Sequence, residues 1–406
     1  MNDKNTTYKD SPLGKIPNDW EVKKLGTLVE IVSGVSPSLF ILNGEGEYPY
    51  LKVEDLNNCE KYQIESREYS NDKKNLVPTN SVIFPKRGAA ILNNKVRINS
   101  VVVQMDSNLM AIYPKSNQLY YEYLYYQIIF EQLHKIADTS TIPQINNKHI
   151  IPYSFPLPPL SEQKAIAHIL GLMDTVIYKN IQLIAQKELQ KKWLMQNLLT
   201  GKKRLKGFSG EWMEYSYEKL LKVVKRNFAW NENELYKLIS VRRRSGGIFY
   251  RETLYGHQIL VKTLRTANEG DFLFSKMQIL HGASALVTKE FDGAKISGSY
   301  IAVVAKDAKL LNLEFFQWYS QVPYFYHQTY ISSYGVHIEK MTFDFDTFLQ
   351  LEMNLPSIEE QTAITKVLQT ADKEIQLLKN KTEKLREQKK GLMQQLLTGK
   401  KRLAII

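Results

Sequence analysis

LPPLSEQKAIAHIL, residues 157–170, is repeated in altered form as LPSIEEQTAITKVL, residues 355–368. The similarity continues from both stretches to a shared ending, LLTGKKRL, so that residues 157–205 align without a gap with residues 355–403. The offset is a constant 198 residues, and 23 of the 49 aligned positions are identical, mostly near the two ends. A duplication of this size means that each part of the chain has a counterpart.

The parts of the chain in front of the two copies are about equally long but far less alike. A conserved scaffold that carries two diverged surfaces fits two different binding specificities. We therefore predict four segments: a variable block at 1–156, a helical repeat at 157–205, a second variable block at 206–354 and a second helical repeat at 355–406.

The net charge of +12 is concentrated in the repeats. Each repeat segment carries an excess of five basic side chains, whereas the first block is neutral and the second has an excess of two. A basic chain is typical of a nucleic-acid partner, but in the neutral blocks any such contact must come from local clusters of Lys and Arg. The excess on the repeats favours protein partners there.

Composition and length exclude several classes of protein. A chain of 406 residues has room for two to four domains. Cys59 is the only cysteine, which excludes an internal disulfide and a cluster of thiolate metal ligands. The first residues lack the apolar core of a signal peptide, and there is no run of about 18 apolar residues that could cross a membrane. We expect a cytoplasmic protein without membrane contact.

Apolar residues in both repeats follow the alternating spacing of a coiled-coil seam. The first seam consists of Ile166, Leu170, Met173, Ile177, Ile184, Leu194 and Leu198, and the second of Ile364, Leu368, Ala371, Ile375, Leu378, Leu385, Leu392 and Leu396. Polar residues interrupt the seams at Asn180, Lys187, Lys191, Thr382 and Lys389. Such residues lower stability but fix register and partner. Helices of about 38 residues would be roughly 55–60 Å long, and each would need a partner, for which the other repeat is the nearest candidate.

Signals for the start and end of a helix flank each repeat. Ser357 and Glu360 have the spacing of a capping box, whereas the first copy has Pro159 in place of the serine. Gly201 and Gly399 are placed to take the left-handed conformation that ends a helix. The Lys-Lys-Arg after each glycine either contacts phosphate or a protein partner, or offsets the negative end of the helix dipole. The sequence favours neither interpretation.

Both variable blocks are predicted to be mixed α/β with many short strands. In the first block we predict strands at 30–32, 50–53, 81–84, 97–104 and 109–113, then an aromatic helix around 120–133. In the second we predict strands at 237–241, 271–274, 284–288 and 299–304, then a helix around 313–319. The order of elements is the same, so we predict two diverged copies of one fold.

Small basic clusters follow equivalent strands in the two blocks: Lys86-Arg87 in the first, and Arg242-Arg243-Arg244 and Lys276 in the second. Arg and Gln can read guanine and adenine edges, while Lys and backbone amides can hold phosphates. Three consecutive arginines cannot all face one way on a strand. Hydroxyl-rich loops at 138–143 and 332–336 occupy corresponding places and suit the same contacts.

The candidates for DNA contact are Lys52, Lys86, Arg87, Thr141, Arg242, Arg243, Lys276, Gln278 and Tyr334. Taken singly, each basic cluster is explained as well by a solvated surface, and each loop by an ordinary turn. Their parallel placement after equivalent strands favours DNA contact for the set.

The sequence contains no recognisable catalytic motif. No Walker-type loop and no GxGxxG motif is present, and the Asn/Asp-Pro-Pro-aromatic tetrad of amino-methyltransferases is missing. Glu21-Val22-Lys23 resembles the end of a nuclease motif, but Asp19 is too close to it to complete a metal site. The seven histidines do not lie at ligand spacing with carboxylates. We predict no catalytic residues, no metal ligands and no cofactor in this chain.

Several motifs together resemble the specificity subunit of type I restriction-modification systems. They are GKIPNDW at 14–20, SGVSP at 33–37, the Leu-Pro-x-x-x-Glu-Gln runs at 157–163 and 355–361, and both Leu-Leu-Thr-Gly-Lys endings. The resemblance covers nearly the whole chain. The second block departs from it at Trp212, which lacks the preceding Ile-Pro.

The resemblance implies a DNA reader without catalytic activity. Two target recognition domains would each bind one half of a bipartite double-stranded DNA site. The implied fold class is two mixed α/β (α+β) domains alternating with two long helices that pair as an antiparallel coiled coil. The helices would separate the domains and dock two methylation subunits that use S-adenosylmethionine. Restriction subunits would add cleavage driven by ATP and Mg²⁺, so these cofactors belong to the partners.

Two other functions stay open on the residues alone. The chain could be a fused subunit that itself cuts or methylates DNA, which modification by the purified chain would reveal. It could also be a structural coiled-coil adaptor, which salt-dependent DNA binding would exclude.

Overall fold

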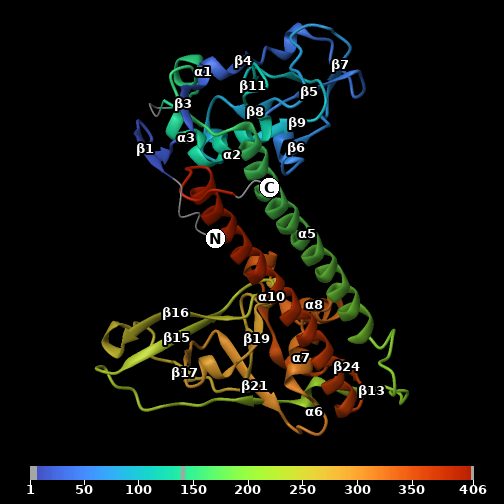
Figure 1. The fold of residues 1–406 in the computed structure, drawn as a ribbon. Helices are drawn as coiled ribbons and strands as arrows, with labels where there is room; N and C mark the ends of the chain where they lie inside the picture. Colours follow the sequence, from blue (N-terminus) through green and yellow to red (C-terminus); the bar gives the residue numbers. More distant parts are fainter. Residues whose placement is uncertain (1–6, 139–141, 404–406) are drawn as a thin grey trace. The chain divides into compact units, whose positions relative to one another are not determined.

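The computed structural model describes residues 7–138 and 142–403 (Figure 1). The chain forms two compact units: unit 1 comprises residues 1–181 and 380–406, and unit 2 comprises residues 182–379. Two helices of 39 residues each, α5 (Leu160–Leu198) and α10 (Ile358–Leu396), contribute one part to each unit. The predicted class of mixed α/β domains alternating with two long helices is confirmed.

Unit 1 is built on a five-stranded sheet with the order β4-β11-β8-β9-β6. The strands are β4 (Val29–Ser33), β11 (Leu109–Pro114), β8 (Val82–Pro85), β9 (Arg97–Asn99) and β6 (Tyr62–Gln63). A smaller sheet consists of β10 (Gln104–Met105), β5 (Tyr48–Leu51) and β7 (Tyr69–Ser70). Helix α2 (Tyr121–Glu131) packs on β8 and β9, since its buried Tyr123, Leu124 and Ile128 share one core with these strands.

Short elements complete unit 1. They are β1 (Tyr8–Ser11), β2 (Gly14–Pro17), β3 (Glu21–Lys24), α1 (Leu25–Leu28), α3 (Leu133–Ile136), α4 (Asn147–Ile150) and β12 (Ser154–Leu157). Strand β12 pairs with β3 and leads directly into α5, so the pair joins the first residues of the block to its last.

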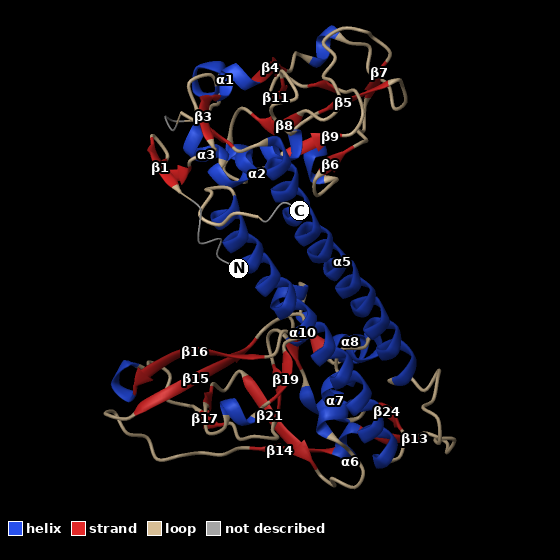
Figure 2. Cartoon of the chain, in the orientation of Figure 1, coloured by secondary structure: helices blue, strands red, loops and turns tan. Residues whose placement is uncertain are grey.

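Unit 2 has a four-stranded sheet with the order β14-β21-β18-β19 and a second one with the order β16-β15-β20-β17 (Figure 2). The first consists of β14 (Leu221–Val224), β21 (Tyr300–Ala305), β18 (Phe272–Ser275) and β19 (Ser284–Leu286). The second consists of β16 (Ile248–Tyr255), β15 (Leu235–Val241), β20 (Lys295–Ile296) and β17 (Arg265–Thr266). The other elements are β13 (Met213–Ser216), α6 (Tyr217–Leu220), α7 (Leu313–Tyr319), α8 (Pro323–Ile331), β22 (Ser333–Tyr334), β23 (Thr342–Phe343), α9 (Phe345–Leu349) and β24 (Glu352–Leu355).

The two units share one topology. The order β4-β11-β8-β9 in unit 1 matches β14-β21-β18-β19 in unit 2. The parallel pair β5–β10 matches the parallel pair β15–β20, and the closing pair β3–β12 matches β13–β24. The prediction of two diverged copies of one fold is therefore confirmed.

One predicted strand, at 97–104, is wrong. The chain forms β9 at 97–99, leaves the sheet, and pairs again only as β10 at 104–105. The buried side chain of Asn99 causes the break, because its amide donates to the carbonyl oxygen of Val101 two residues further on and its oxygen accepts from Ser81 N. A side chain that bonds the nearby backbone in this way replaces the ladder of a continuous strand. Strand β16 and helix α8 were not predicted.

The two long helices run antiparallel within each unit. In unit 2, Lys187 pairs with Glu374 at 2.9 Å and Lys191, further along α5, pairs with Asp372, which is earlier in α10. In unit 1, Asp174 pairs with Lys389. Residue numbers thus rise in one helix as they fall in the other.

Every predicted seam position is buried or half-buried, including the polar interruptions. Lys191 and Lys389 interrupt the two seams at equivalent positions, and each pairs with an aspartate of the opposite helix. Lys191 also lies over the ring of Trp318, and Lys389 over that of Tyr126. An ion pair across the seam is satisfied in one register only, which gives these breaks a physical role.

The ends of the helix pair belong to the cores of the two units. Ile166 and Leu170 of α5 and Met393 and Leu396 of α10 pack in the core of unit 1. Leu198 of α5 and the beginning of α10 pack equivalently in unit 2. Both repeats thus contribute to both cores. The predicted four segments follow the repeats in the sequence, whereas each compact unit combines one variable block with parts of both repeats.

Candidate nucleic-acid interface

One edge of the unit 1 sheet gathers three loops. Strands β4 and β8 both run antiparallel to β11, so both end where β11 begins. The loop after β8 is held at this edge by hydrogen bonds from Lys86 N to Asn108 O (2.8 Å) and from Ile145 N to Lys86 O (2.9 Å). Gly88 N donates to Pro143 O at 3.0 Å. The basic cluster after β8 therefore lies beside the second half of the hydroxyl-rich loop; the candidate Thr141 lies outside the described residues.

Lys86 and Arg87 form a local positive site. Lys86 is half-buried and Arg87 is exposed, and neither forms an ion pair within the described part of the chain. Burial, and next the neighbouring Arg87 charge, lower the pKa of the Lys86 ammonium. An anion placed here would relieve both effects, so these two cations suit a phosphate.

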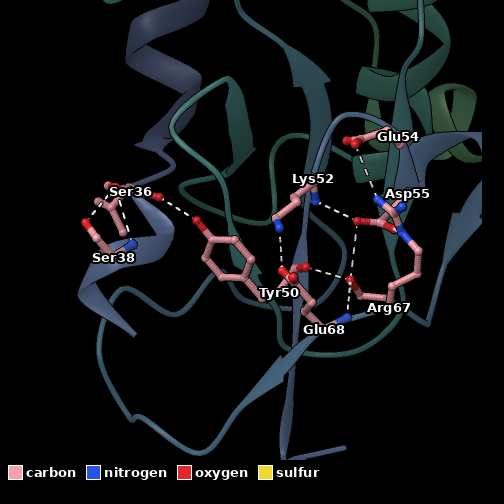
Figure 3. Close-up of polar contacts among 10 residues, drawn as sticks. Ser36, Ser38, Tyr50, Lys52, Glu54, Asp55, Arg67 and Glu68 are labelled. Atoms are coloured by element: carbon pink, nitrogen blue, oxygen red, sulfur yellow. Dashed lines mark hydrogen bonds and ion pairs between the residues drawn. The ribbon is translucent and has the colours of Figure 1, made fainter. Parts of the chain in front are cut away.

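Lys52 has an internal partner, which the sequence did not reveal. It follows β5, and its Nζ lies 2.6 Å from Glu68 Oε2 (Figure 3). Its backbone N donates to the buried carboxylate of Asp55, which also accepts from Arg67 Nε at 2.9 Å. Lys52 thus sits in a cluster of alternating charge, and its positive charge is already neutralised.

The loop after β4 lies next to the same edge. Gly34, in the SGVSP motif, is packed so closely that an added Cβ would lie 1.9 Å from Asp106 O. Val35 N donates to Met105 O, and its carbonyl accepts from the Tyr50 hydroxyl at 2.7 Å. Figure 3 shows Tyr50 reaching this loop beside Ser36. The glycine is required here by a close backbone approach.

Unit 2 repeats this edge. Strands β14 and β18 both end where β21 begins. Lys276 N donates to Ser299 O at 2.9 Å, and Lys276 O accepts from Phe343 N at 3.0 Å, the same pair of bonds that holds Lys86. Lys86 and Lys276 are therefore structurally equivalent. The side chain of Gln278 reaches inward, and its buried Oε1 has no hydrogen-bond partner within residues 7–138 and 142–403.

Two further loops join this edge in unit 2. The turn after β15 is attached by Arg244 N to His281 O (2.6 Å) and by Ser245 N to Gly282 O (2.9 Å). The segment 333–343 carries Tyr334, which is 65% exposed, on the short pair β22–β23. The structure thus brings together candidates from three separate stretches of sequence.

The three consecutive arginines point to three different surroundings. The guanidinium of Arg242 lies 4.5 Å from the centre of the Phe249 ring. Arg243 Nη2 pairs with Glu339 Oε2 at 3.3 Å. Arg244, which was not among the predicted contacts, lines a hollow with Ser245, His281 and Tyr326. The expectation that they cannot all face one way is confirmed.

Each Glu-Gln pair of the repeats connects a block to its helix. Gln163 accepts from Tyr120 N at 2.8 Å and donates to the carbonyls of Gln118 and Pro158. Gln361 makes the same three bonds in unit 2, with Asn312, Leu310 and Pro356. A buried glutamine amide satisfied in this way fixes the start of each long helix against the helix of its block.

The arginines of the Lys-Lys-Arg endings pair with the glutamates. Arg402 Nε donates to Glu162 Oε1 at 2.7 Å, and Arg204 Nε donates to Glu360 Oε1 at 2.6 Å. Arg402 also makes two bonds to Asp19, and Glu162 accepts from Trp20 Nε1 at 2.9 Å. These arginines therefore have an internal structural role, and the predicted capping box at Ser357 lacks its Glu360 half because Arg204 binds that carboxylate. Gly201 and Gly399 have φ of 69° and 71°, as predicted.

Within residues 7–138 and 142–403, no group of three or more His, Cys, Asp or Glu is placed to hold a metal ion. In the same part of the chain, no helix is both long enough and apolar enough to cross a membrane.

The comparisons with known proteins agree with this architecture. The family model of the type I restriction modification DNA specificity domain matches residues 17–191 and again residues 210–387. The chain therefore belongs to this family, as the resemblance of its motifs indicates.

Among its relatives are two proteins of Methanocaldococcus jannaschii. The putative type I restriction enzyme MjaX specificity subunit is 26% identical, over 98% of this chain and 98% of that protein. The type I restriction enzyme MjaVIII specificity subunit is 24% identical, over 98% and 97%.

Solved structures share the fold. The S subunit of a type I restriction-modification system from M. genitalium matches with a TM-score of 0.55 and 13% identity, over 95% of this chain and 98% of that one. A chain from a structure of type I complex assembly and conformational transition matches with a TM-score of 0.61 and 13% identity, over 95% and 99%. Each of these two matches extends over both the α/β units and the long helices of this chain.

Proposed function

We propose that this chain is the sequence-specific DNA-binding subunit of a type I restriction-modification complex. One observation carries the proposal: the basic loops of the two units are held at the same sheet edge by the same backbone bonds, at Lys86 and at Lys276. Around this common frame the side chains differ. A constant frame with different loops is what two half-sites of different sequence require.

The two units would each read one half of a bipartite double-stranded site, in the cytoplasm. Lys86, Arg87, Arg242, Lys276 and Tyr334 are the described candidates that remain without an ion pair. Gln278 would reach DNA only after its buried side chain turned outward, and Thr141 stays a prediction. Lys52 and Arg243 would reach DNA only after leaving Glu68 and Glu339. Phosphate contacts would supply affinity, and base edges specificity.

The antiparallel helices would set the spacing between half-sites. Each helix of 39 residues is about 58 Å long at 1.5 Å per residue. Their outward surfaces, which carry the excess basic charge, would dock two methylation subunits and, through the complex, the restriction subunits. The chain itself would have no catalytic role, so S-adenosylmethionine, ATP and Mg²⁺ would bind to the partners.

Exchange of one variable block tests whether each unit reads its own half-site independently of the other. Residues 1–156 are replaced by the corresponding block of a relative, and the methylated sites of a host that expresses the complete system are sequenced. We expect one half-site to change and the other half-site and the spacing to stay. A change in both halves contradicts the proposal, and so does methylation by the purified chain without partners.

Lengthening of both helices tests their role as a spacer. Seven residues, which preserve the heptad, are inserted after residue 182 and after residue 380, near the middle of each helix. Each helix grows by about 10 Å, or about three base pairs at 3.4 Å per pair. We expect the spacer of the methylated site to lengthen accordingly while both half-sites stay. An unchanged spacer in an active complex contradicts the proposal.

A further inference from the structure

A hollow at the edge of unit 2 is lined by hydrogen-bond donors and by no acidic side chain. Its volume is about 440 Å³. The apolar part of its wall is Met195 of α5 and Leu280, and the polar part is Arg244, Ser245, His281, Gln321 and Tyr326. A set of guanidinium, hydroxyl, imidazole and amide groups suits an anion with several oxygen atoms.

The backbone at the mouth of the hollow is held in an unfavourable conformation. Arg244 and Ser245 have φ of 56° and 52°, in the left-handed region that glycine enters freely and other residues enter at a cost. Their amides are anchored to His281 O and Gly282 O at 2.6 and 2.9 Å. Since Gly246 and Gly247 follow directly, the position of Arg and Ser in the strained part of the turn points to a use for their side chains.

Two hydroxyl groups meet inside the hollow. Ser245 Oγ lies 3.1 Å from the Tyr326 hydroxyl. Gly282 makes this approach possible, because a Cβ there would lie 2.4 Å from the same hydroxyl. Either oxygen can donate to a bound anion while it accepts from the other.

Of the three consecutive arginines, Arg244 is the one that lines the hollow. Arg242 lies on Phe249, and Arg243 is paired with Glu339. Arg244 forms no ion pair with any described carboxylate. His281 Nε2 lies 3.3 Å from Glu339 Oε1 but makes no hydrogen bond with any described residue, and Glu339 is not part of the lining of the hollow. The hollow thus keeps one full positive charge.

We propose that the hollow binds a single phosphate of the DNA backbone, held by the Arg244 guanidinium and by one hydroxyl of the hydrogen-bonded pair Ser245–Tyr326. The inference rests on the proposed function, since it assumes that unit 2 binds DNA. It also makes the two units unequal. The segment after the equivalent strand of unit 1 is Glu54-Asp55-Leu56, whose carboxylates bind Arg67, so unit 1 has no matching site there.

Substitution of Arg244 by glycine separates binding from folding. Arg244→Gly removes the cation, while a φ of 56° suits glycine, so thermal stability is expected to stay or rise. The full chain, assembled with its methylation subunits, is titrated with a labelled mixed-sequence DNA duplex over a range of KCl. We expect roughly tenfold weaker binding and a slope of log K against log salt that is smaller by about 0.9, the value of one lost phosphate contact.

Two matched variants sharpen this test. Tyr326→Phe removes one neutral donor and is expected to weaken binding roughly threefold without a change of slope. Arg251→Ala is the control, because Arg251 is an exposed arginine of the same unit that pairs with Glu252. It is expected to leave both quantities unchanged.

The outcomes against the proposal are distinct. If the wild-type complex binds DNA but Arg244→Gly has the same affinity and slope, the phosphate site is wrong and the proposed function stands. If inorganic phosphate raises the melting temperature only when Arg244 is present, and the DNA slope is unchanged, the hollow binds a free anion and the DNA assignment is wrong. If the wild-type complex shows no salt-dependent DNA binding, the proposed function itself fails.

Discussion

The two ends of the helix pair contain the same Glu-Gln dipeptide but complete it differently. In unit 1, Glu162 accepts hydrogen bonds from both Trp20 and Arg402, and Arg402 binds Asp19 as well. In unit 2, the Glu360 carboxylate binds Arg204 alone among the residues that the structure describes. The counterpart of Trp20 there is Trp212, whose buried indole N–H has no hydrogen-bond acceptor in the described part of the chain.

The difference follows the path of the chain. Arg402 and Asp19 are 383 residues apart in sequence, so no adjacent backbone keeps these two side chains together. Arg204 is followed after a few residues by Trp212, and the unbroken backbone keeps these two close. The guanidinium of Arg204 rests on the Trp212 ring at 5.8 Å. The arginine in unit 1, which no neighbouring stretch of backbone keeps close to its partners, thus makes more side-chain bonds than the arginine in unit 2.

Removal of the two glutamates should lower the stability of the two units by different amounts. The Glu162 side chain is 1% exposed, and its loss leaves both the Trp20 N–H and part of the Arg402 charge unpaired. We expect Glu162→Ala to lower the free energy of unfolding of unit 1 by roughly 3 kcal/mol or more. Glu360→Ala leaves Arg204 unpaired but no buried indole N–H, and should cost about 2 kcal/mol in unit 2.

Hydrogen exchange of the full chain measures each end separately, since two units need not unfold in one step. Protection in β3 and β12 reports on unit 1, and protection in β13 and β24 on unit 2. Glu21→Ala, at an exposed glutamate near the first site, serves as the control. Equal losses at both ends would contradict the comparison.

The tryptophans give the next largest contrast. Trp20→Phe removes a hydrogen bond to a buried carboxylate, and we expect a loss of about 2 kcal/mol. Trp212→Phe removes an N–H that has no acceptor among the described residues, so the loss should stay below about 1 kcal/mol and come from the smaller ring. Urea unfolding followed by hydrogen exchange decides between them, and a larger loss for Trp212→Phe would show that its indole is satisfied in solution.

A third contrast lies at the first turns of the helices. Glu360 N donates to Ser357 Oγ at 3.4 Å, whereas Pro159 occupies the equivalent place in the first repeat. Ser357→Ala should cost about 1 kcal/mol, the usual value of a lost helix cap. Pro159→Ser gains a cap but loses a rigid residue, so its net effect should be smaller in size. Thermal unfolding of both variants tests this, and a neutral Ser357→Ala would mean that the long bond contributes nothing.

Much of the fold was predictable because it rests on local patterns. The 198-residue repeat and the spacing of Ile166, Leu170 and their counterparts predict two paired helices of the observed length. The left-handed conformations of Gly201 and Gly399 follow from their place after the last turn. The equivalence of Lys86 and Lys276 follows from their position after matching strands.

The remaining features depend on contacts between distant residues. Nothing in the sequence joins Arg402 to Glu162 or Lys52 to Glu68, since each pair meets only through the tertiary fold. The signal that could have found the arginines is the identity of both Lys-Lys-Arg endings together with both Glu-Gln pairs. Arg244 was named in the basic cluster but not among the contacts, because its proposed role depends on a left-handed backbone conformation that adjacent glycines would more naturally take.

The smallest expected contrast is a dependence on pH in unit 1 alone. The hydrogen bonds from Arg402 lower the pKa of the Asp19 carboxyl from its ordinary 3.8. A carboxyl with a depressed folded-state pKa contributes stability above its unfolded value, and this is lost as the pH falls through the folded value. Because the Asp19 side chain is about half exposed, we expect less than about 1 kcal/mol. The protection of β3 and β12 from hydrogen exchange should therefore fall more steeply between pH 5 and 3 in the wild type than in Asp19→Asn. The control is Glu211→Gln, at the equivalent place in unit 2, which should leave the pH profile of protection in β13 and β24 unchanged. Coincident profiles of the wild type and Asp19→Asn would mean that Glu162 alone holds Arg402.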